Sequence, residues 1–326
     1  MTEALLSIRN LSIEIPTRDK ILTPVEGVSF DVMPGEILGV VGESGAGKSL
    51  TGTAVIGLLD PPGRIGGGEI RFLGRRIDNL PPEQMRRLRG AEIGMIFQDP
   101  LTSLNPLYTV GQQLTETLRT HQNISPAEAR ARAIGLLEEV GIPAAERRFD
   151  QYPHEFSGGM RQRVVIALAL ANDPKLIIAD EPTTALDVSV QAQIIALLKR
   201  LAADHGASVI LITHDMGVIA ETADRVAVMY AGRIMEIGPV EHVVKNPSHP
   251  YTQGLMASIP RIGHGPERLS HIKGAMPRPG SVPPGCPFHP RCPYVFEPCD
   301  KERPELMQGP NSLAACWLLD EEKAHG

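Results

Sequence analysis

The sequence predicts an α/β fold organised around a parallel sheet. One observation is the apolar segment 37–41, which reads as a buried strand and leads into a glycine-rich segment and then a helical pattern. Another is a pair of later apolar segments, 175–179 and 209–213, which also read as buried strands and end in polar residues. Between these strands the periodicity becomes helical, which indicates a helical insertion.

The glycine-rich segment 42–49 reads Gly-Glu-Ser-Gly-Ala-Gly-Lys-Ser and matches the GxxxxGK[ST] pattern of a phosphate-binding loop. Its glycines let backbone N–H groups point at phosphate oxygens, and the next helix presents its positive N-terminus. Lys48 can reach the β- and γ-phosphates, and the Ser49 hydroxyl can bind Mg²⁺. The predicted nucleotide-binding residues are Gly42, Glu43, Ser44, Gly45, Ala46, Gly47, Lys48, Ser49 and Leu50. Kinases, GTPases and transport ATPases all share such a loop, so further motifs must decide the function.

Length and composition limit the function classes. With 326 residues, 42% of them hydrophobic, the chain can bury a full core and hold two or three subdomains. It has no run of 18 apolar residues, and residues 1–6 lack the basic region of a signal peptide, so we expect a cytoplasmic protein. The net charge of −6 gives no sign of nucleic-acid binding, and the basic cluster 86–89 is interpreted as a solvated face.

The N-terminal block is predicted to be rich in strands. Residues 4–15 and 25–32 alternate between apolar and polar side chains, which predicts an antiparallel element. After the helix that follows the phosphate loop, the glycine-rich turn 63–68 and the short strand 69–73 complete this block.

Two further signals flank the predicted helical insertion. Gln98 ends the apolar strand 93–97, and its side-chain carbonyl can coordinate Mg²⁺, although alone it would be an ordinary polar residue near a proline. Residues 110–140 have a period of about 3.6, with a typical helix start at Ser125. Ser157, Gly158 and Gly159 then open another helix, whose N-terminus is a second anion site. A single pocket would not need two such helix ends.

Polar residues also follow the two later strands. Asp180 is placed to hold Mg²⁺, and Glu181 is placed to polarise the water that attacks the γ-phosphate. Another helix begins near Asp187. A lone histidine at a strand end is usually structural, but His214 can hydrogen-bond the γ-phosphate and the water if it lies beside these carboxylates.

This ordered set of motifs resembles the nucleotide-binding domain of ATP-binding cassette (ABC) proteins over residues 1–240, with a helical subdomain at about 99–165. The resemblance implies an α/β fold of the P-loop (RecA-like) type and Mg²⁺-dependent ATP hydrolysis, with Glu181, His214 and Gln98 as catalytic residues. It also implies that the nucleotide is bound by residues outside the phosphate loop, namely Gln98, Ser157, Gly158, Gly159, Asp180 and Asp187. It also implies a head-to-tail dimer, in which each ATP lies between the phosphate loop of one subunit and the Ser-Gly-Gly helix of the other. Closing of this dimer on ATP, and its opening after hydrolysis, would be the mechanical step.

The chain departs from the common ABC pattern at two places. Phe156 and Met160 stand where the signature usually has leucine and glutamine, but the Ser-Gly-Gly between them is intact. The segment 16–24 lacks the aromatic residue that commonly stacks on adenine, and Ile21 or Leu22 is expected to take its place.

Three segments narrow the branch of the family. Residues 98–106, 152–155 and 249–252 resemble the ATPase subunits of bacterial dipeptide and oligopeptide importers. By resemblance, this chain pairs with a second, non-identical ATPase beneath two membrane-spanning permease subunits, which an extracytoplasmic peptide-binding protein supplies. It would then lie on the cytoplasmic side of the inner membrane, with the segment after Gln98 lining a groove for a permease helix.

Residues 241–326 are predicted to form a C-terminal extension with a metal site. The stretch 260–310 holds 12 of the 29 prolines, so irregular structure is expected. The four cysteines, Cys286, Cys292, Cys299 and Cys316, could bind a [4Fe–4S] cluster, Zn²⁺ or no metal, and the resemblance favours the cluster. His249 and His289 are expected to be structural.

Rival functions share part of this pattern. A soluble ABC ATPase of translation or DNA repair usually carries two cassettes or long inserts, and a GTPase would need Asn-Lys-x-Asp, which is absent from the sequence. An importer of nickel, a haem precursor or an antimicrobial peptide remains open, because the cargo never touches this subunit.

Overall fold

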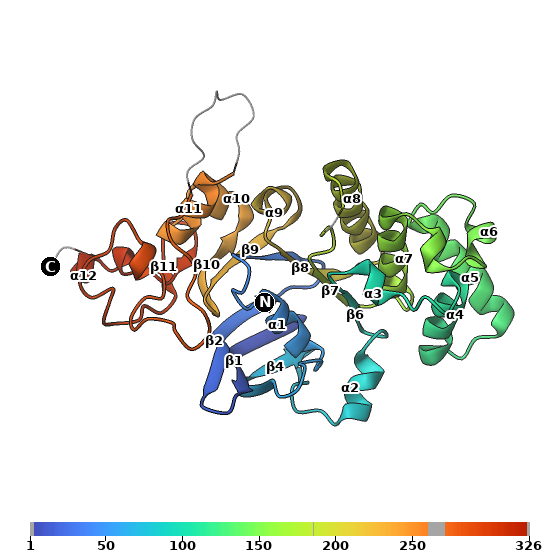
Figure 1. Cartoon of the computed structure of the whole chain (residues 1–326), viewed down its shortest axis with the longest axis horizontal. Coiled ribbons are helices and arrows are strands. Elements are labelled where there is room, and N and C mark those ends of the chain that lie inside the picture. The colour runs from blue at the N-terminus through green and yellow to red at the C-terminus, as the bar shows by residue number, and fades with distance from the viewer. Residues whose placement is uncertain (1–2, 185, 260–270, 325–326) are drawn as a thin grey trace.

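The computed structural model describes residues 3–184, 186–259 and 271–324, which contain two sheets with helices packed around them (Figure 1). The smaller sheet is antiparallel, with the strand order β2-β1-β4-β5. Its strands are β1 (Leu6–Pro16), β2 (Ile21–Val32), β4 (Arg64–Phe72) and β5 (Arg75–Arg76). Leu6 pairs with Val32 and Ile13 pairs with Val25, which confirms the predicted antiparallel element.

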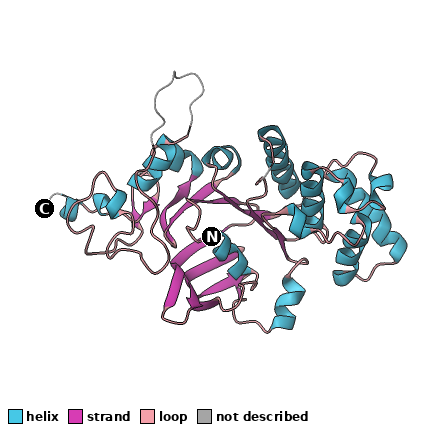
Figure 2. Cartoon of the chain, viewed as in Figure 1, coloured by secondary structure: helices cyan, strands magenta, loops and turns pink. Residues whose placement is uncertain are grey.

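The larger sheet, whose strands are drawn in magenta in Figure 2 together with those of the smaller sheet, has the strand order β11-β12-β10-β9-β3-β8-β7-β6. The neighbours from β9 to β6 are parallel and the others antiparallel. Its strands are β3 (Ile37–Val41), β6 (Ile93–Ile96), β7 (Leu176–Asp180), β8 (Ser208–Thr213), β9 (Arg225–Tyr230), β10 (Arg233–Pro239), β11 (Met307–Gln308) and β12 (Leu313–Ala314). The predicted parallel strands are thus confirmed, whereas the addition of β11 and β12 to the sheet was not anticipated.

Alternate side chains of the parallel strands pack on opposite faces of the larger sheet. Val40 and Ile178 join the core formed with the antiparallel sheet, α1 (Lys48–Val55) and α2 (Pro82–Leu88). Val41 and Ile177 join a second core, formed with α7 (Gly158–Leu170), α8 (Val188–Asp204) and α9 (Met216–Thr222). Since both faces are covered, the strands are apolar throughout, which is why they were readable in the sequence.

The helical insertion lies at the end of the molecule opposite α12 (Figure 1). It contains α3 (Pro100–Ser103), α4 (Val110–His121), α5 (Pro126–Glu139), α6 (Ala145–Phe149) and the 3₁₀ turn Pro153–Glu155, and it leads into α7. The Ser125 hydroxyl accepts from the Glu128 N–H (3.2 Å), and the Glu128 carboxylate accepts from the Ser125 N–H (2.8 Å). This capping box confirms the predicted helix start.

The C-terminal extension packs against the β10 edge of the larger sheet. Its helices are α10 (Val240–Lys245), α11 (Pro250–Ala257), α12 (Glu321–Ala324) and the 3₁₀ turns His289–Arg291 and Trp317–Leu319. The buried Glu236 carboxylate on β10 accepts from the N–H groups of Ser248 and His249 and from the Ser312 hydroxyl. The expected irregular structure is confirmed for 271–310, and 260–270 lie outside the described residues. Within the described ranges, no helix is both long and apolar enough to cross a membrane.

His205, at the C-terminus of α8, joins the helical insertion to the rest of the molecule. Its Nε2 lies 2.7 Å from Glu139 Oε1 on α5, and its Nδ1 lies 2.9 Å from Asp173 Oδ1. Burial acts to lower the pKa of His205, but hydrogen bonds with the two carboxylates outweigh it and raise the pKa above its usual value. Protonated His205 therefore stabilises the folded state.

We expect His205→Gln to lower the melting temperature most at about pH 6, and progressively less at higher pH. A raised folded-state pKa gives a stabilising contribution that is complete below the unfolded pKa and is lost as the pH rises through the folded pKa. Thermal melts of both proteins between about pH 5.5 and 9 would measure this. His242→Gln, at a half-exposed histidine, is the control, and a melting difference for His205→Gln that is independent of pH would contradict the assignment.

Candidate nucleotide site

The phosphate loop joins β3 to α1, as predicted. Gly47, the residue before α1, has a left-handed backbone with φ 98°, and Gly45 has φ 84°, which glycine adopts most readily. A Cβ on Gly42 would lie 2.1 Å from the Met229 carbonyl oxygen, so no larger residue fits there. The loop therefore needs glycine at these positions to place its backbone against β9. The side chain of Leu50 is half-buried and packs against the core.

Lys48 lies beneath this loop. Its ammonium is buried and donates to the carbonyl oxygens of Gly42 (2.8 Å) and Glu43 (3.1 Å). Burial lowers the pKa of Lys48, and the nearby carboxylates of Glu181 and Asp180 oppose that shift. These contacts hold a positive charge at the loop, where phosphate oxygens would be neutralised.

A pair of oxygen ligands lies at the start of α1. The Ser49 hydroxyl donates to Asp180 Oδ1 at the end of β7, at 2.9 Å. Burial raises the pKa of Asp180, and the hydrogen bond from Ser49 only partly offsets this effect. A hydroxyl and a buried carboxylate in contact are suitable ligands for Mg²⁺, which prefers oxygen, and a cation there would favour the ionised carboxylate.

Two of the predicted residues, Gln98 and His214, converge on the Glu181 carboxylate. Gln98 Nε2 lies 3.0 Å from Glu181 Oε2, and His214 Nδ1 lies 3.3 Å from Glu181 Oε1. Thr184, which was not predicted, donates to Oε2 at 2.9 Å. Burial acts to raise the pKa of Glu181, but the hydrogen bonds from Thr184 and His214 outweigh it, so the pKa lies below its usual value. Glu181 is therefore an ionised acceptor beside Asp180.

An unusual backbone conformation sets the direction of the Glu181 side chain. Glu181 has φ 45°, an unusual conformation for a residue with a side chain, and its N–H donates to the Ile212 carbonyl on β8 (2.8 Å). Such outliers cluster at functional sites because the surrounding structure must hold them. Since β6, β7 and β8 are parallel neighbours, Gln98, Glu181 and His214 all follow the same edge of the sheet.

The second predicted anion site is separate from this group. The Ser157 hydroxyl caps α7 by accepting from the Met160 N–H (3.3 Å), and a Cβ on Gly159 would lie 2.8 Å from Val190 at the start of α8. Asp187 caps α8 by accepting from the Val190 N–H (3.0 Å). In the described ranges, no hydrogen bond joins Ser157, Gly158, Gly159 or Asp187 to residues 42–50. These residues instead form an exposed surface of their own.

Comparison with known proteins agrees with this geometry. A family model described as ABC transporter matches residues 25–184, and one described as Oligopeptide/dipeptide transporter, C-terminal region matches residues 235–299. The dipeptide transport ATP-binding protein DppD of Bacillus subtilis (strain 168) is 48% identical over 325 residues, 99% of this chain and 97% of the relative. The chain belongs to the ABC transporter ATP-binding protein family. The oligopeptide transport ATP-binding protein OppD of Escherichia coli (strain K12) is 49% identical over 320 residues, 98% of this chain and 95% of OppD.

A solved ABC cassette has the same fold over the nucleotide-binding part. The ATP-binding cassette MJ0796, in a dimeric post-hydrolysis state bound to ADP and Pi, gives a TM-score of 0.65 at 29% identity, covering 72% of this chain and 98% of MJ0796. The predicted fold class, an ABC ATPase cassette of α/β type, is thus confirmed.

The segment expected to hold adenine in this ABC protein lies against the C-terminal extension. Ile21 is 54% exposed and therefore free to meet a base. Leu22 faces the extension instead, since a Cβ on Gly280 would lie 2.6 Å from its Cδ2, and Lys20 Nζ donates to the Gly280 carbonyl at 3.2 Å. Of the two predicted residues, Ile21 has the exposure needed for contact with a base.

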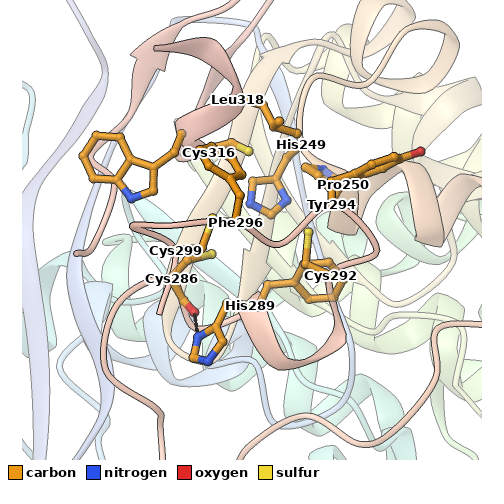
Figure 3. Close-up of a pocket in the computed structure, with 12 residues that line it drawn as sticks. His249, Pro250, Cys286, His289, Cys292, Tyr294, Phe296, Cys299, Cys316 and Leu318 are labelled. Carbon is orange, nitrogen blue, oxygen red and sulfur yellow. Dashed lines mark hydrogen bonds between the residues drawn. The ribbon is translucent and has the colours of Figure 1, made fainter. Parts of the chain in front are cut away.

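The four cysteines line one pocket in the extension (Figure 3). Cys286, Cys299 and Cys316 are buried and Cys292 is half-buried. Burial raises the pKa of Cys286 to about 11 and that of Cys316 to about 12, so these thiols are neutral without a cation. Among the residues that the structure describes, no three cysteine, histidine or acidic side chains form a group that could hold a metal ion. The geometry therefore gives no support to the predicted metal site.

The two histidines beside this pocket have structural roles. His249 Nδ1 accepts from the Tyr251 N–H (2.9 Å) and caps α11, and burial lowers the pKa of His249 to about 3. His289 Nδ1 contacts the Cys286 carbonyl oxygen at 2.9 Å. Both agree with the prediction.

Sequence reasoning also missed two residues of the extension that contact the phosphate loop, Tyr251 and Arg291. They bind Glu43, which lies 208 and 248 positions earlier in the chain. No local pattern could have indicated them, whereas Thr184, three residues after Glu181, could have been found from its spacing.

Proposed function

We propose that this chain is the ATP-hydrolysing subunit of a bacterial ABC importer that drives uptake of dipeptides and oligopeptides. The convergence of Gln98 and His214 on Glu181, beside Ser49 and Asp180, supports hydrolysis. The similarity to DppD and OppD along nearly the whole chain supports peptide import. We assign residues 1–240 to the nucleotide-binding domain, with a helical subdomain at about 99–165, and 241–326 to the importer-type extension.

The proposed site roles follow from the contacts described above. ATP phosphates are bound by residues 42–50, and Mg²⁺ would be held by Ser49 and Asp180. Gln98 is proposed as a further Mg²⁺ ligand, which would require its side-chain oxygen, since its amide nitrogen donates to Glu181. Glu181 accepts a hydrogen bond from the attacking water and polarises it, because it is an ionised acceptor at the site. His214 hydrogen-bonds the water and the γ-phosphate.

The exposed surface of Ser157, Gly158, Gly159 and Asp187 is proposed to complete the ATP site of a second, non-identical ATPase. Ser157, Gly158 and Asp187 are exposed and, among the described residues, make no hydrogen bond to residues 42–50, which supports a partner at this surface. The dimeric state of MJ0796 supports the same arrangement.

A second apolar surface supports contact with the permeases. Four large residues near Gln98, namely Phe97, Leu101, Leu107 and Tyr108, are 42%, 62%, 79% and 49% exposed. We propose that two membrane-spanning permease subunits bind here, and that an extracytoplasmic peptide-binding protein acts through them. The chain would then lie on the cytoplasmic side of the inner membrane, bound peripherally.

Peptide uptake by whole cells tests the function. In a strain that lacks this gene, we expect the wild-type chain to restore uptake of a labelled tripeptide and Lys48→Ala to restore less than about a tenth of it. Lys175→Ala, at an exposed lysine paired with Glu92, is the matched control and should restore uptake fully. A gene-deletion strain with normal peptide uptake but impaired uptake of nickel, a haem precursor or an antimicrobial peptide would favour that cargo, and no uptake defect at all would favour a soluble ABC ATPase.

The cysteine pocket is proposed to bind a [4Fe–4S] cluster, with Zn²⁺ as the alternative. Four thiols on one apolar pocket form a donor set that both groups use. A cluster is larger than a single ion, so its thiolates need not stand at the spacing of a mononuclear site. A bound cation would supply the charge that keeps these buried thiols ionised.

We expect anaerobically purified protein to be brown and to contain about four irons and four sulfides per chain. Cys299→Ser should lose most of the metal and colour, whereas His289→Gln should keep both. Colourless protein with one zinc per chain would show that the pocket binds zinc and not an iron–sulfur cluster. Protein that contains neither iron nor zinc would contradict both the cluster proposal and the zinc proposal.

A further inference from the structure

Glu43, in the phosphate loop, is bound to the C-terminal extension at two points. Its backbone N–H donates to the Tyr251 hydroxyl at 3.0 Å, and its Oε1 accepts from Arg291 Nη1 at 2.8 Å. Its carbonyl oxygen, in turn, accepts from Lys48 Nζ at 3.1 Å. The Glu43 carbonyl oxygen also accepts from the Ala46 N–H at 3.1 Å. The N–H and Oε1 of Glu43 are therefore bound by residues outside the nucleotide-binding domain, and its carbonyl oxygen is bound by residues of the loop itself.

Both extension residues are themselves held in place. The Arg291 side chain is only 7% exposed. Its Nε donates to the Lys273 carbonyl at 2.9 Å, and its guanidinium also lies 3.3 Å from the Ile272 and Gly274 carbonyl oxygens. Since arginine presents its donors in a rigid fork, these carbonyls orient the guanidinium toward Glu43.

Tyr251 is oriented by an aromatic cluster. Its ring is fully buried and meets the Tyr230 ring edge-on at 4.7 Å between centroids, and the Phe288 ring at 5.3 Å. The Tyr230 hydroxyl lies 3.3 Å from Arg291 Nη1. Tyrosine and arginine thus form one rigid unit against which the loop rests.

The extension also contacts the loop at a third point. A Cβ on Gly45 would lie 3.2 Å from the Met276 methyl carbon. The loop is consequently packed between the larger sheet, where Gly42 meets Met229, and the extension.

We propose that Arg291 and Tyr251 are positioning residues for ATP binding, which hold the phosphate loop in its phosphate-binding shape through Glu43. The C-terminal extension is then part of the nucleotide site of its own chain. This inference rests on the proposed binding of ATP by residues 42–50. A purely structural role, in which these residues only attach the extension to the core, is the competing explanation.

The test measures KM and kcat for ATP with the full-length chain assembled with its partner subunits. Tyr251→Phe removes only the hydrogen bond to Glu43. Arg291→Met removes the bond to Glu43 together with those to Tyr230 and to the carbonyls of residues 272–274, and both variants keep most of the packing. We expect each to raise KM roughly three- to tenfold, the effect of one lost hydrogen bond, and to leave kcat within about twofold. Arg291→Lys should recover part of the loss, since it keeps the charge but not the fork.

A double-mutant cycle separates positioning from attachment. If Arg291 acts through Glu43, Glu43→Ala should raise KM, and adding Arg291→Met to it should raise KM no further. The matched control is Arg303→Met, because Arg303 also attaches the extension to the core, through Glu26 at 2.9 Å, but does not contact the loop. It should leave KM unchanged.

Several outcomes would overturn the proposal. Unchanged KM in Arg291→Met and Tyr251→Phe would do so, as would an equal rise in Arg303→Met, or effects of Glu43→Ala and Arg291→Met that multiply. If Arg291→Met does not fold, Tyr251→Phe and Glu43→Ala decide the question alone. Failure of the wild-type chain to bind ATP at all would instead refute the proposed function, so the two failures are distinguishable.

Discussion

Glu181→Gln is expected to lower ATP turnover by about 10²- to 10⁴-fold while ATP binding is preserved. The substitution removes the charge that polarises the attacking water, and general-base catalysis contributes a factor of this size. Glutamine has nearly the same shape and keeps an acceptor oxygen for the hydrogen bonds that Gln98 and Thr184 now donate. Phosphate release by the assembled ATPase pair would measure turnover, and equilibrium binding of a fluorescent ATP analogue would measure affinity.

The same variant should trap the closed dimer. ATP favours the closed state and its hydrolysis normally releases it, so a variant that binds without hydrolysing should accumulate that state. Light scattering with Mg²⁺ and ATP would detect a stable pair of ATPases. Glu92→Gln, at an exposed glutamate paired with Lys175, should leave turnover and dissociation normal. Hydrolysis by Glu181→Gln at the wild-type rate would remove Glu181 from its catalytic role.

The sequence predicted this part of the site because its residues follow strands. Glu181 and His214 each come directly after an apolar strand that is buried along its whole length, and Gln98 follows the apolar segment 93–97. Such segments are easy to recognise. The ends of parallel strands lie at one edge of a sheet, so residues that follow neighbouring strands meet. That β6, β7 and β8 are neighbours could be inferred only through the resemblance, since strand order leaves no local signal.

The features that the sequence did not predict depend on contacts between residues that are far apart in the sequence. The pairing of Glu236 on β10 with Ala314 on β12 joins the extension to the larger sheet, but β11 and β12 have only two residues each and therefore no periodicity to detect. Arg291 stands in a proline-rich stretch without a pattern, and its value to the phosphate loop appears only once Glu43 is beside it. The cysteines show a different limit of sequence analysis. Their clustering in the sequence predicted that they would lie near one another, and they do line one pocket. The sequence could not predict the distances between the sulfur atoms, which do not form a metal-binding group among the described residues.

Ser157→Asp is expected to weaken ATP binding at the partner's phosphate loop by at least about tenfold and to spare the loop of this chain. Aspartate caps a helix as well as serine does, so α7 should keep the hydrogen bond from the Met160 N–H. The aspartate also places a negative charge at the exposed N-terminus of α7. In the proposed dimer, the γ-phosphate of the partner's ATP binds at this helix N-terminus. Repulsion between the two charges at contact distance amounts to several kcal/mol, which exceeds the attraction of the helix N-terminus.

The readout is the labelling of each ATPase by a photoreactive ATP analogue, with Glu181→Gln present to hold the closed state. Labelling of the partner subunit should fall and that of this chain should persist. Ser157→Asn is the matched control, since asparagine also caps the helix but adds no charge, and it should lower the partner's labelling much less. Loss confined to this chain's own loop would mean that α7 serves the site of its own subunit. In that case Ser157 would have to move toward residues 42–50 of the same chain. A second ATPase would then not be needed to complete the nucleotide site.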